Sequence, residues 1–285
     1  MALVIGGFWA RQLQGSWAND LIIALGGPVT IIGEAGSDVI LGSRAGDVIH
    51  GDCVTGPLPW EEPRPGNNLI FAGGGDDTVY AGFGADWVWG GDGDDLIFGH
   101  GMGRPGGGSD AERALRLDGA DWLQGGAGND TVHGGGGDDT IHGGEGDDRL
   151  SGGFGADVLS GGPGADVFVF GRGGPASDFA PHTATRETGT PDVILDLEQG
   201  VDRIDVAGLG HSHMPWLPMQ FLGQGEFIPS IDPQLRYEWL DDGTTLVQIF
   251  SLVGRPPPDF VPAPRSAAGI VLAGHVALTE QDFIL

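Results

Sequence analysis

Apolar residues recur every ninth position through much of the first 170 residues. The clearest stretch runs from Gly125 to Val169 and reads GGAGNDTVH, GGGGDDTIH, GGEGDDRLS, GGFGADVLS and GGPGADVFV. These are five copies of a unit G-G-x-G-x-D-x-U-x, in which U is a large apolar residue. A short period with three fixed glycines predicts a parallel β-helix, because each unit is too small to bury its apolar residue alone.

The same nine-residue spacing extends back to Gly6 when two insertions are allowed, at residues 53–64 and 101–117. This gives about fifteen units, and the eighth position is apolar in every one. The glycine-rich first six positions predict a turn, and the last three predict a short strand whose middle side chain points inward. We expect two units per turn of the coil, so that odd and even units lie on opposite sheets. The eighth positions are Leu13, Ile22, Ile31, Ile40, Ile49, Ile70, Val79, Val88, Ile97, Leu123, Val132, Ile141, Leu150, Leu159 and Phe168.

The sixth position of most units is Asp, which adds candidate chemistry to this pattern. Aspartates on stacked turns, next to backbone carbonyls freed by the glycines, offer an all-oxygen shell that suits Ca²⁺ better than Zn²⁺. The first three units lack the pattern, because Arg11 and Val29 stand where Asp is expected. We therefore expect residues 1–32 to form a degenerate N-terminal cap that closes the stack without metal.

Composition supports cations as partners. The chain has 40 acidic and 13 basic residues and a formal charge of −27, which argues against nucleic acid as a ligand. The single cysteine, Cys53, permits no internal disulfide. The first residues lack the basic region and the long apolar run of a signal peptide, and we expect no membrane span.

After residue 169 the pattern changes. Residues 170–191 are rich in Gly, Pro, Ser and Thr and predict a connector. Residues 192–285 contain alternating apolar positions and turn dipeptides, which predict a second, β-rich domain with antiparallel strands.

Residues 33–169, and more weakly 6–32, resemble the RTX repeats of secreted bacterial proteins such as serralysin-type metalloproteases, family I.3 lipases and the R-modules of alginate epimerases. The resemblance implies an all-β parallel β-roll that binds about 8–10 calcium ions through the sixth-position aspartates. Asn68 departs from the pattern and places its own sites in doubt. The implied ligands are Asp38, Asp47, Asp77, Asp86, Asp95, Asp121, Asp130, Asp139, Asp148, Asp157 and Asp166, with loop carbonyls such as those of Gly126, Gly128, Gly135, Gly137, Gly144, Gly146, Gly153 and Gly155.

The C-terminal region resembles the C-terminal domain of serralysin-type proteins, whose entry pattern matches DVILDLEQGVDRID from Asp192 onward. The ending Asp282-Phe283-Ile284-Leu285 resembles the uncleaved signal that type I ABC exporters recognise. The resemblance implies export of an unfolded chain without an N-terminal signal, followed by folding on calcium outside the cell.

No catalytic motif of these relatives is present. The eight histidines never form H-E-x-x-H, and the nearest approach to G-x-S-x-G, at residues 210–214, lacks the second glycine. His133 and His142 fall in adjacent units, which predicts opposite sheets rather than a shared metal site. We therefore expect a non-enzymatic binding or structural protein. The alternative is an enzyme, for example one that modifies polysaccharides, with a site in the insertions or the C-terminal domain.

An aromatic patch is predicted on one outer face. Both insertions fall in even units, and the outward positions of the sixth, eighth and tenth units are mostly large and apolar. One interpretation is that the insertions or the C-terminal domain cover this patch as ordinary core. The other is a platform for a glycan or protein partner. The patch consists of Trp60, Leu69, Phe71, Trp87, Trp89 and Trp122.

Overall fold

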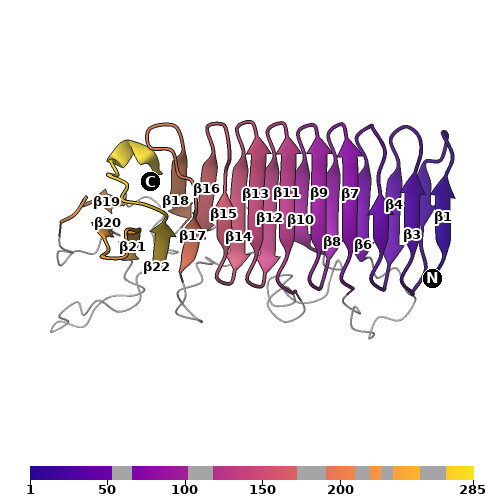
Figure 1. Cartoon of the computed structure of the whole chain (residues 1–285), viewed down its shortest axis with the longest axis horizontal. Helices are drawn as coiled ribbons and strands as arrows, with labels where there is room; N and C mark the ends of the chain where they lie inside the picture. The colour runs from indigo at the N-terminus through magenta and orange to yellow at the C-terminus, as the bar shows by residue number, and fades with distance from the viewer. Residues whose placement is uncertain (53–65, 102–117, 172–190, 209–218, 226–233, 251–267) are drawn as a thin grey trace.

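The computed structural model describes residues 1–52, 66–101, 118–171, 191–208, 219–225, 234–250 and 268–285. Within them the chain winds into a stack of turns that forms two long β-sheets facing each other (Figure 1). The first sheet contains thirteen strands and the second contains ten. Both predicted insertions and most of the connector lie outside the described residues, as do Trp60 and residues 210–214.

The first sheet runs in the order β1 (Leu3–Gly6), β3 (Leu21–Ala24), β5 (Val39–Leu41), β7 (Leu69–Gly74), β9 (Trp87–Asp92), β11 (Trp122–Ala127), β13 (Thr140–Glu145), β15 (Val158–Ser160), β17 (Asp192–Ile194), β22 (Ala268–Leu272), β21 (Thr245–Phe250), β20 (Gln234–Trp239) and β19 (Gln220–Phe221). The second runs β2 (Gln12–Gln14), β4 (Thr30–Glu34), β6 (Val48–Asp52), β8 (Thr78–Gly82), β10 (Leu96–His100), β12 (Thr131–Gly136), β14 (Arg149–Phe154), β16 (Val167–Gly171), β18 (Arg203–Gly208) and β23 (Phe283–Ile284).

Successive strands alternate between the sheets, and each strand pairs in parallel with the strand one full turn later. Ile70 on β7, for example, lies opposite Val88 on β9, which lies opposite Leu123 on β11. The predicted parallel β-roll with two units per turn is therefore confirmed. β1 lies before the first unit, so the first unit contributes β2 and the second contributes β3. Every even-numbered unit therefore contributes an odd-numbered strand.

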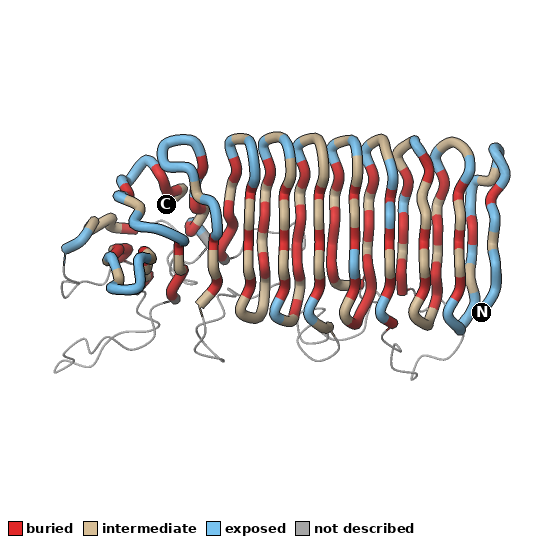
Figure 2. Tube along the Cα trace, viewed as in Figure 1, coloured by how far each residue is buried: buried red, intermediate tan, exposed pale blue. Residues whose placement is uncertain are grey.

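The eighth-position side chains form the core between the two sheets. Every one of them is fully buried except Leu13, which is 7% exposed. Figure 2 shows the result as rows of buried residues along both sheets, with exposed residues concentrated at the turns. Burying one apolar residue from each unit gives the stack a continuous core that no single unit could form.

Glycine is required where neighbouring turns touch. Gly144 and Gly146 have φ values of 131° and 121°, in the left-handed region. A Cβ atom on either would overlap the carbonyl oxygen of the glycine one turn earlier, Gly126 or Gly128. The repeated glycines therefore set how closely the turns approach.

The roll continues beyond Val169, where the sequence pattern placed its end. β17 pairs in parallel with β15, and β18 pairs in parallel with β16. Ile194 and Ile204 take the buried eighth position in these strands. The spacing across residues 170–191 differs from nine, which hides this register in the sequence.

The C-terminal residues are added to both sheets. β22 and β23 pair in parallel with β17 and β18, whereas β20, β21 and β22 pair antiparallel, as predicted for this region. An ion pair of 2.9 Å between Arg149 and Asp205 links β14 to β18. The described residues include one helix, the three-residue 3-10 turn η2 (Glu280–Asp282), and none with the length and apolar character needed to cross a membrane.

Candidate calcium sites

The sixth-position side chains form two ladders, one along each edge of the roll where the chain passes between the sheets. In each ladder, Oδ1 of one residue accepts the backbone N–H of the sixth-position residue one turn earlier. The Asp77 N–H donates to Asp95 at 2.8 Å, and the Asp130 N–H donates to Asp148 at 2.8 Å. One ladder contains Asp20, Asp38, Asn68, Asp86, Asp121, Asp139, Asp157 and Asp192; the other contains Asp47, Asp77, Asp95, Asp130, Asp148, Asp166 and Asp202.

The second carboxylate oxygen, Oδ2, has no hydrogen-bond donor in most of these residues, although all of them are buried. A buried charged oxygen without a partner is strongly destabilising, so each one requires a cation or a proton. This property holds for ten of the eleven predicted ligands. They are Asp38, Asp77, Asp86, Asp95, Asp121, Asp130, Asp139, Asp148, Asp157 and Asp166.

A carbonyl oxygen lies close to six of these unpaired oxygens, those of Asp38, Asp95, Asp121, Asp130, Asp139 and Asp148. A Cβ atom on Gly125 would meet both Oδ2 of Asp130 and the carbonyl oxygen of Gly143, one turn later. The same convergence occurs at Gly134, beside Asp139. Carboxylate and carbonyl oxygens that converge in this way are the donors that Ca²⁺ prefers.

The predicted second- and fourth-position carbonyls lie at the same turns. The carbonyl oxygens of Gly126 and Gly128 point along the roll toward Gly144 and Gly146. A Cβ atom added to Gly144 or Gly146 would overlap them. Among the described residues, no group of three or more His, Cys, Asp or Glu side chains is arranged to hold a metal. A metal here therefore needs backbone oxygens as well as carboxylates.

Burial makes the ladders poor places for unneutralised charge. It raises the pKa of Asp77, Asp95 and Asp148 to about 7, and neighbouring aspartates add to the effect. Burial raises the pKa of Asp121 and Asp139 well above the ordinary value, again with help from neighbouring carboxylates. The donor set and its charge fit a calcium ion, which would replace the proton at neutral pH.

Three aspartates are exceptions, because protein groups donate to their Oδ2. The Ser16 N–H and hydroxyl donate to Asp20 at 2.6 and 2.7 Å, and the Ser43 N–H donates to Asp47 at 2.7 Å. Asp202 accepts the Glu198 N–H at 2.7 Å. Asp47, predicted as a ligand, therefore differs from the other ten.

Asn68 is the most informative exception. Its Oδ1 accepts the Asp38 N–H at 2.9 Å, which keeps the ladder intact. Its Nδ2 donates to the Ala81 carbonyl at 3.0 Å. Ala81 is the first residue of its unit, as Gly143 is of another. The carbonyl of Gly143 lies close to the unpaired Oδ2 of Asp130, whereas the equivalent carbonyl of Ala81 accepts a hydrogen bond from the Asn68 amide.

Four aspartates in these turns were not predicted. Asp192 and Asp202 extend the ladders, since they accept the N–H groups of Asp157 and Asp166 at 3.0 Å. The spacing Asp192-Val193-Ile194 repeats the D-x-U of the unit and was a usable signal.

The other two, Asp52 and Asp118, border the insertions, so the nine-residue spacing does not reveal them. Asp52 accepts the N–H groups of Gly66 and Phe83 through Oδ2 at 3.1 and 3.2 Å, and its Oδ1 has no donor. Burial raises the pKa of Asp52 to about 7 and that of Asp118 to about 8.

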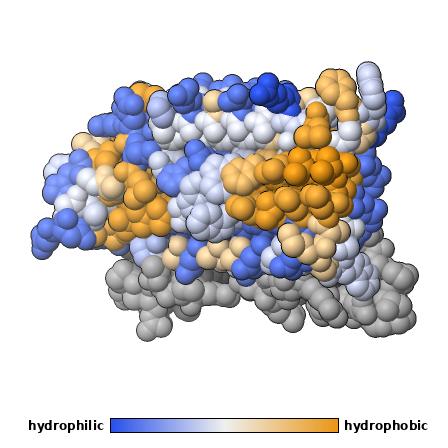
Figure 3. Space-filling view, turned by 45° about the vertical axis from the view of Figure 1, so that its right-hand side comes forward, coloured by the Kyte–Doolittle hydropathy of each residue, from blue (hydrophilic) through white to orange (hydrophobic). Residues whose placement is uncertain are grey.

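The structure brings the predicted aromatic patch together on β7, β9 and β11. Trp89 lies 4.6 Å from Phe71 and 4.7 Å from Trp122, measured between ring centroids. Aliphatic side chains continue the same outer face on β3 and β5, and Figure 3 shows a broad hydrophobic area on this part of the roll. His133 and His142 lie on β12 and β13, in opposite sheets as predicted.

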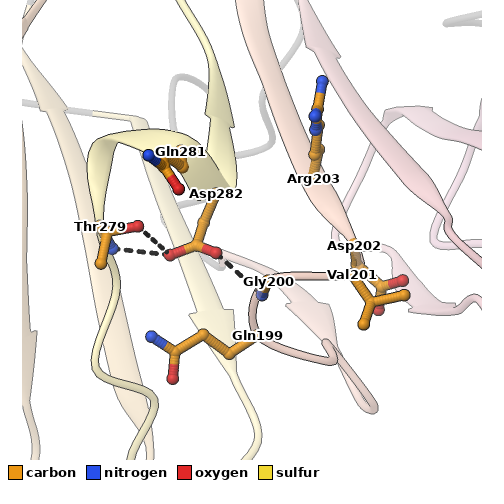
Figure 4. Close-up of a pocket in the computed structure, with 8 residues that line it drawn as sticks. All are labelled: Gln199, Gly200, Val201, Asp202, Arg203, Thr279, Gln281 and Asp282. Carbon is orange, nitrogen blue, oxygen red and sulfur yellow. Dashed lines mark hydrogen bonds between the residues drawn. The ribbon is translucent and has the colours of Figure 1, made fainter.

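A polar cavity of about 330 Å³ lies beside the C-terminus (Figure 4). Asp282 on its wall accepts the N–H of Gly200 at 3.1 Å, and the N–H and hydroxyl of Thr279 at 2.7 and 2.9 Å. These bonds join the C-terminal residues to the turn between β17 and β18. The carboxylate of Asp282 thus has a structural role.

Comparison with known proteins supports the calcium assignment. Residues 14–51, 64–97, 117–150 and 142–174 match the family model of the RTX calcium-binding nonapeptide repeat. No curated protein sequence matches the chain significantly.

Two solved structures are similar to this chain, both subunits of the Azotobacter vinelandii mannuronan C5-epimerase. For AlgE6R3 the identity is 19% over 81% of this chain and 86% of that chain, with a TM-score of 0.27. For AlgE6R2 it is 25% over 68% and 89%, with a TM-score of 0.25. The description of the fold rests on the strand pairing given above and not on these two structures.

Proposed function

We propose that this chain, which carries RTX calcium-binding nonapeptide repeats in a parallel β-roll, is exported unfolded by a type I ABC exporter and folds on calcium outside the cell. The folded roll then serves as a non-enzymatic binding or structural component at the cell surface or in the surrounding matrix. The observation that carries the proposal is the row of ten buried carboxylate oxygens without a protein donor.

Those oxygens make folding depend on calcium. At neutral pH without calcium, the ladders place carboxylates in buried positions next to one another, and ordering a chain with 56 glycines costs much conformational entropy. Calcium removes the electrostatic cost, and its binding free energy becomes folding free energy. In the low calcium of a cytosol the chain would stay unfolded and competent for export.

The position of the C-terminal end agrees with export before folding. Phe283 on β23 is buried and pairs with Ile204 on β18, and Asp282 is buried as well. A C-terminal signal that is read as an extended segment would be accessible only in the unfolded chain. The resemblance of residues 192–285 to the C-terminal domain of serralysin-type proteins remains part of this proposal.

Far-UV circular dichroism across a calcium titration tests the folding step. We expect an unfolded spectrum in excess EGTA and a β spectrum as calcium rises toward about 10⁻⁴ to 10⁻³ M, the range of extracellular calcium modules. Magnesium at equal concentration is the control, because its smaller octahedral shell fits these irregular oxygen sites poorly. An unchanged β spectrum in EGTA would contradict the proposal.

The non-enzymatic role has a separate test. The calcium-loaded protein is incubated with a panel of polysaccharides, and both retention and the products are analysed. Retention or indifference with unaltered polysaccharide agrees with the proposal, whereas new uronate epimers, shorter chains or unsaturated ends would show an enzyme.

A further inference from the structure

The outer face of the first sheet carries a long uncharged surface. Its aliphatic part is Leu21 and Ile23 on β3 and Val39 and Leu41 on β5, and its aromatic part is Trp87 and Trp89 on β9 and Trp122 on β11. Leu69 and Phe71 on β7 lie between the two parts. We call this surface, from β3 to β11, the apolar stripe.

The outer face of the second sheet is less apolar, although His50, Tyr80, Phe98 and His133 form a row of stacked rings on it. Its outward positions mix polar and apolar residues, for example Gln12 and Gln14 on β2, Thr30 on β4, Thr78 on β8 and Arg149 on β14. What distinguishes the first sheet is a large apolar side chain at nine of the ten outward positions from β3 to β11. Exposed apolar patches of this extent mark an interaction surface.

The geometry of the rings indicates what kind of partner fits. Phe71 and Trp89 are stacked with an interplanar angle of 11° and a centroid distance of 4.6 Å, so each ring covers a face of the other. A sugar ring would need a free aromatic face to stack on. At Phe71 and Trp89 the stripe instead presents ring edges, with aliphatic side chains beside them, which favours close packing against another protein surface.

We propose that the apolar stripe binds the apolar stripe of a second copy of this chain. A two-fold axis through β7 places the aliphatic β3 and β5 of one copy over the aromatic β11 and β9 of the other, and Phe71 meets its own counterpart. Each contact then occurs twice, as an isologous interface requires. Two sheets packed face to face lie about 10 Å apart, a distance that large apolar side chains from both sides fill.

The area agrees with a weak but specific dimer. With the flanking β1 and β13, seven strands about 4.8 Å apart give a contact about 34 Å long and about 15 Å wide, or about 500 Å² per copy. The total of about 1,000 Å² is at the low end of specific interfaces. The exposed fractions agree, since Phe71 and Trp87 are 38% and 52% exposed in the single chain.

The distribution of charge agrees as well. The aspartates lie at the turns, along the edges of the roll, so none is buried when two stripes meet. Repulsion between two acidic chains opposes the dimer and is reduced by bound cations and by salt. The inference requires only a folded roll, and it does not depend on the route of export.

Sedimentation velocity of the calcium-loaded protein from about 1 to about 100 µM, the range expected for a small interface, tests the dimer. The matched variants are Val39→Glu on the stripe and Val48→Glu at the equivalent outward position of β6, on the second sheet; Val48 is 38% exposed. We expect the wild type and Val48→Glu to dimerise alike, and Val39→Glu to weaken dimerisation at least about tenfold, because two charges are buried per dimer. Circular dichroism and calcium stoichiometry establish that each variant is folded.

Cross-linking gives a second readout that needs no loss of binding. In a Cys53→Ser background, Phe71→Cys places one thiol from each copy at the two-fold axis, where a short bismaleimide should join them. Val48→Cys should not cross-link. A wild type that stays monomeric at about 100 µM, whether or not it is retained by a glycan, would overturn the proposal, as would equal effects of Val39→Glu and Val48→Glu.

Discussion

In the N-terminal turns of the roll, Oδ2 of Asp20 and of Asp47 accepts hydrogen bonds from Ser16 and Ser43, whereas the five aspartates at the sixth position of residues 125–169 have no protein donor for that oxygen. Both regions share the ladder through Oδ1 and the buried eighth position, but the turn backbone differs. The second position of the unit is Ser16 or Ser43 in the first region and a glycine with positive φ, such as Gly126 or Gly135, in the second. The fold therefore does not require calcium at every turn. It requires a hydrogen-bond donor or a cation beside each buried carboxylate, and at Asp20 and Asp47 the turn supplies the donor through the backbone N–H of Ser16 and of Ser43.

The turns thus fall into two classes, those in which protein groups satisfy the sixth-position side chain and those in which Oδ2 has no protein donor. Asn68 shows the smallest change that moves a turn from the second class to the first. Its amide keeps the ladder bond with Oδ1 and places an N–H group on the Ala81 carbonyl. One atom exchanged, oxygen for NH₂, removes both the charge and the unpaired acceptor. At Asn68 the difference is thus a matter of single atoms within the common ladder.

The largest expected effect comes from protons in place of calcium. The folded calcium-free chain holds the pKa of Asp77, Asp95 and Asp148 at about 7, above the unfolded value of 3.8. It therefore binds more protons than the unfolded chain, and this stability is fully present below about pH 4 and is lost as the pH rises through about 7. We expect calcium-depleted protein to show a β spectrum near pH 4 and an unfolded one near pH 7.5. Circular dichroism of dilute protein measures this, and a β spectrum that strengthens with rising pH would contradict the account.

The next largest effect is expected from a glycine of the repeat block. Gly146→Ala forces a side chain onto the Gly128 carbonyl at a φ of 121° and should cost at least about 2 kcal/mol of unfolding free energy in calcium. Gly27→Ala in the N-terminal turns is the control, because nothing lies within 4 Å of its Cβ position. Thermal or urea unfolding measures both. Equal losses would show that close contact between turns does not distinguish the two sites.

Asp139→Asn makes a turn of the repeat block resemble Asn68. We expect the variant to bind about one calcium ion fewer, and its calcium-free form to be more stable by about 1–3 kcal/mol at neutral pH, because a buried unpaired charge is gone. Asp47→Asn should leave the ion count unchanged, since its new amide meets the Ser43 N–H and can only destabilise the turn. Calorimetric calcium titration reports the ion count, and the pH at which the calcium-free protein unfolds, higher in Asp139→Asn than in the wild type, reports the change in stability. An unchanged ion count in Asp139→Asn would contradict the assignment of that turn.

The reverse change is expected to have an effect of similar size and opposite sign. Asn68→Asp should restore the unpaired oxygen facing Ala81, add about one ion, and destabilise the calcium-free roll by about 1–3 kcal/mol. Asn67→Asp, at an exposed position beside it, controls for added charge. Equal ion counts in Asn68→Asp and the wild type would show that the amide does not exclude the cation.

Much of the fold could be predicted from the sequence because each position of the repeat has one structural role throughout the roll. The inward residues, the alternation of sheets and the ladder from Asp77 to Asp166 all follow from spacing alone. Asp192 and Asp202 were missed because residues 170–191 break that spacing. The roles of Ser16 and Ser43 were missed because a donor to Oδ2 depends on turn geometry, which the identity of the sixth residue does not encode.

The apolar stripe shows a different limit. The aromatic half was visible in the sequence, but Leu21, Ile23, Val39 and Leu41 read as ordinary strand residues until the register placed them beside it. Ring orientation could not be predicted either, and it is the mutual stacking of Phe71 and Trp89 that favours a protein partner over a sugar.

The most direct test of the difference between the two classes of turn is an anomalous difference map from crystals grown in calcium. The account predicts peaks about 2.3–2.6 Å from Oδ2 of the aspartates that lack a protein donor, including those at 130, 139, 148 and 157. It predicts none beside Asn68, Asp47 or Asp202, where protein donors already satisfy the side chain. Peaks beside Asn68, or none beside residues 130–157, would contradict it.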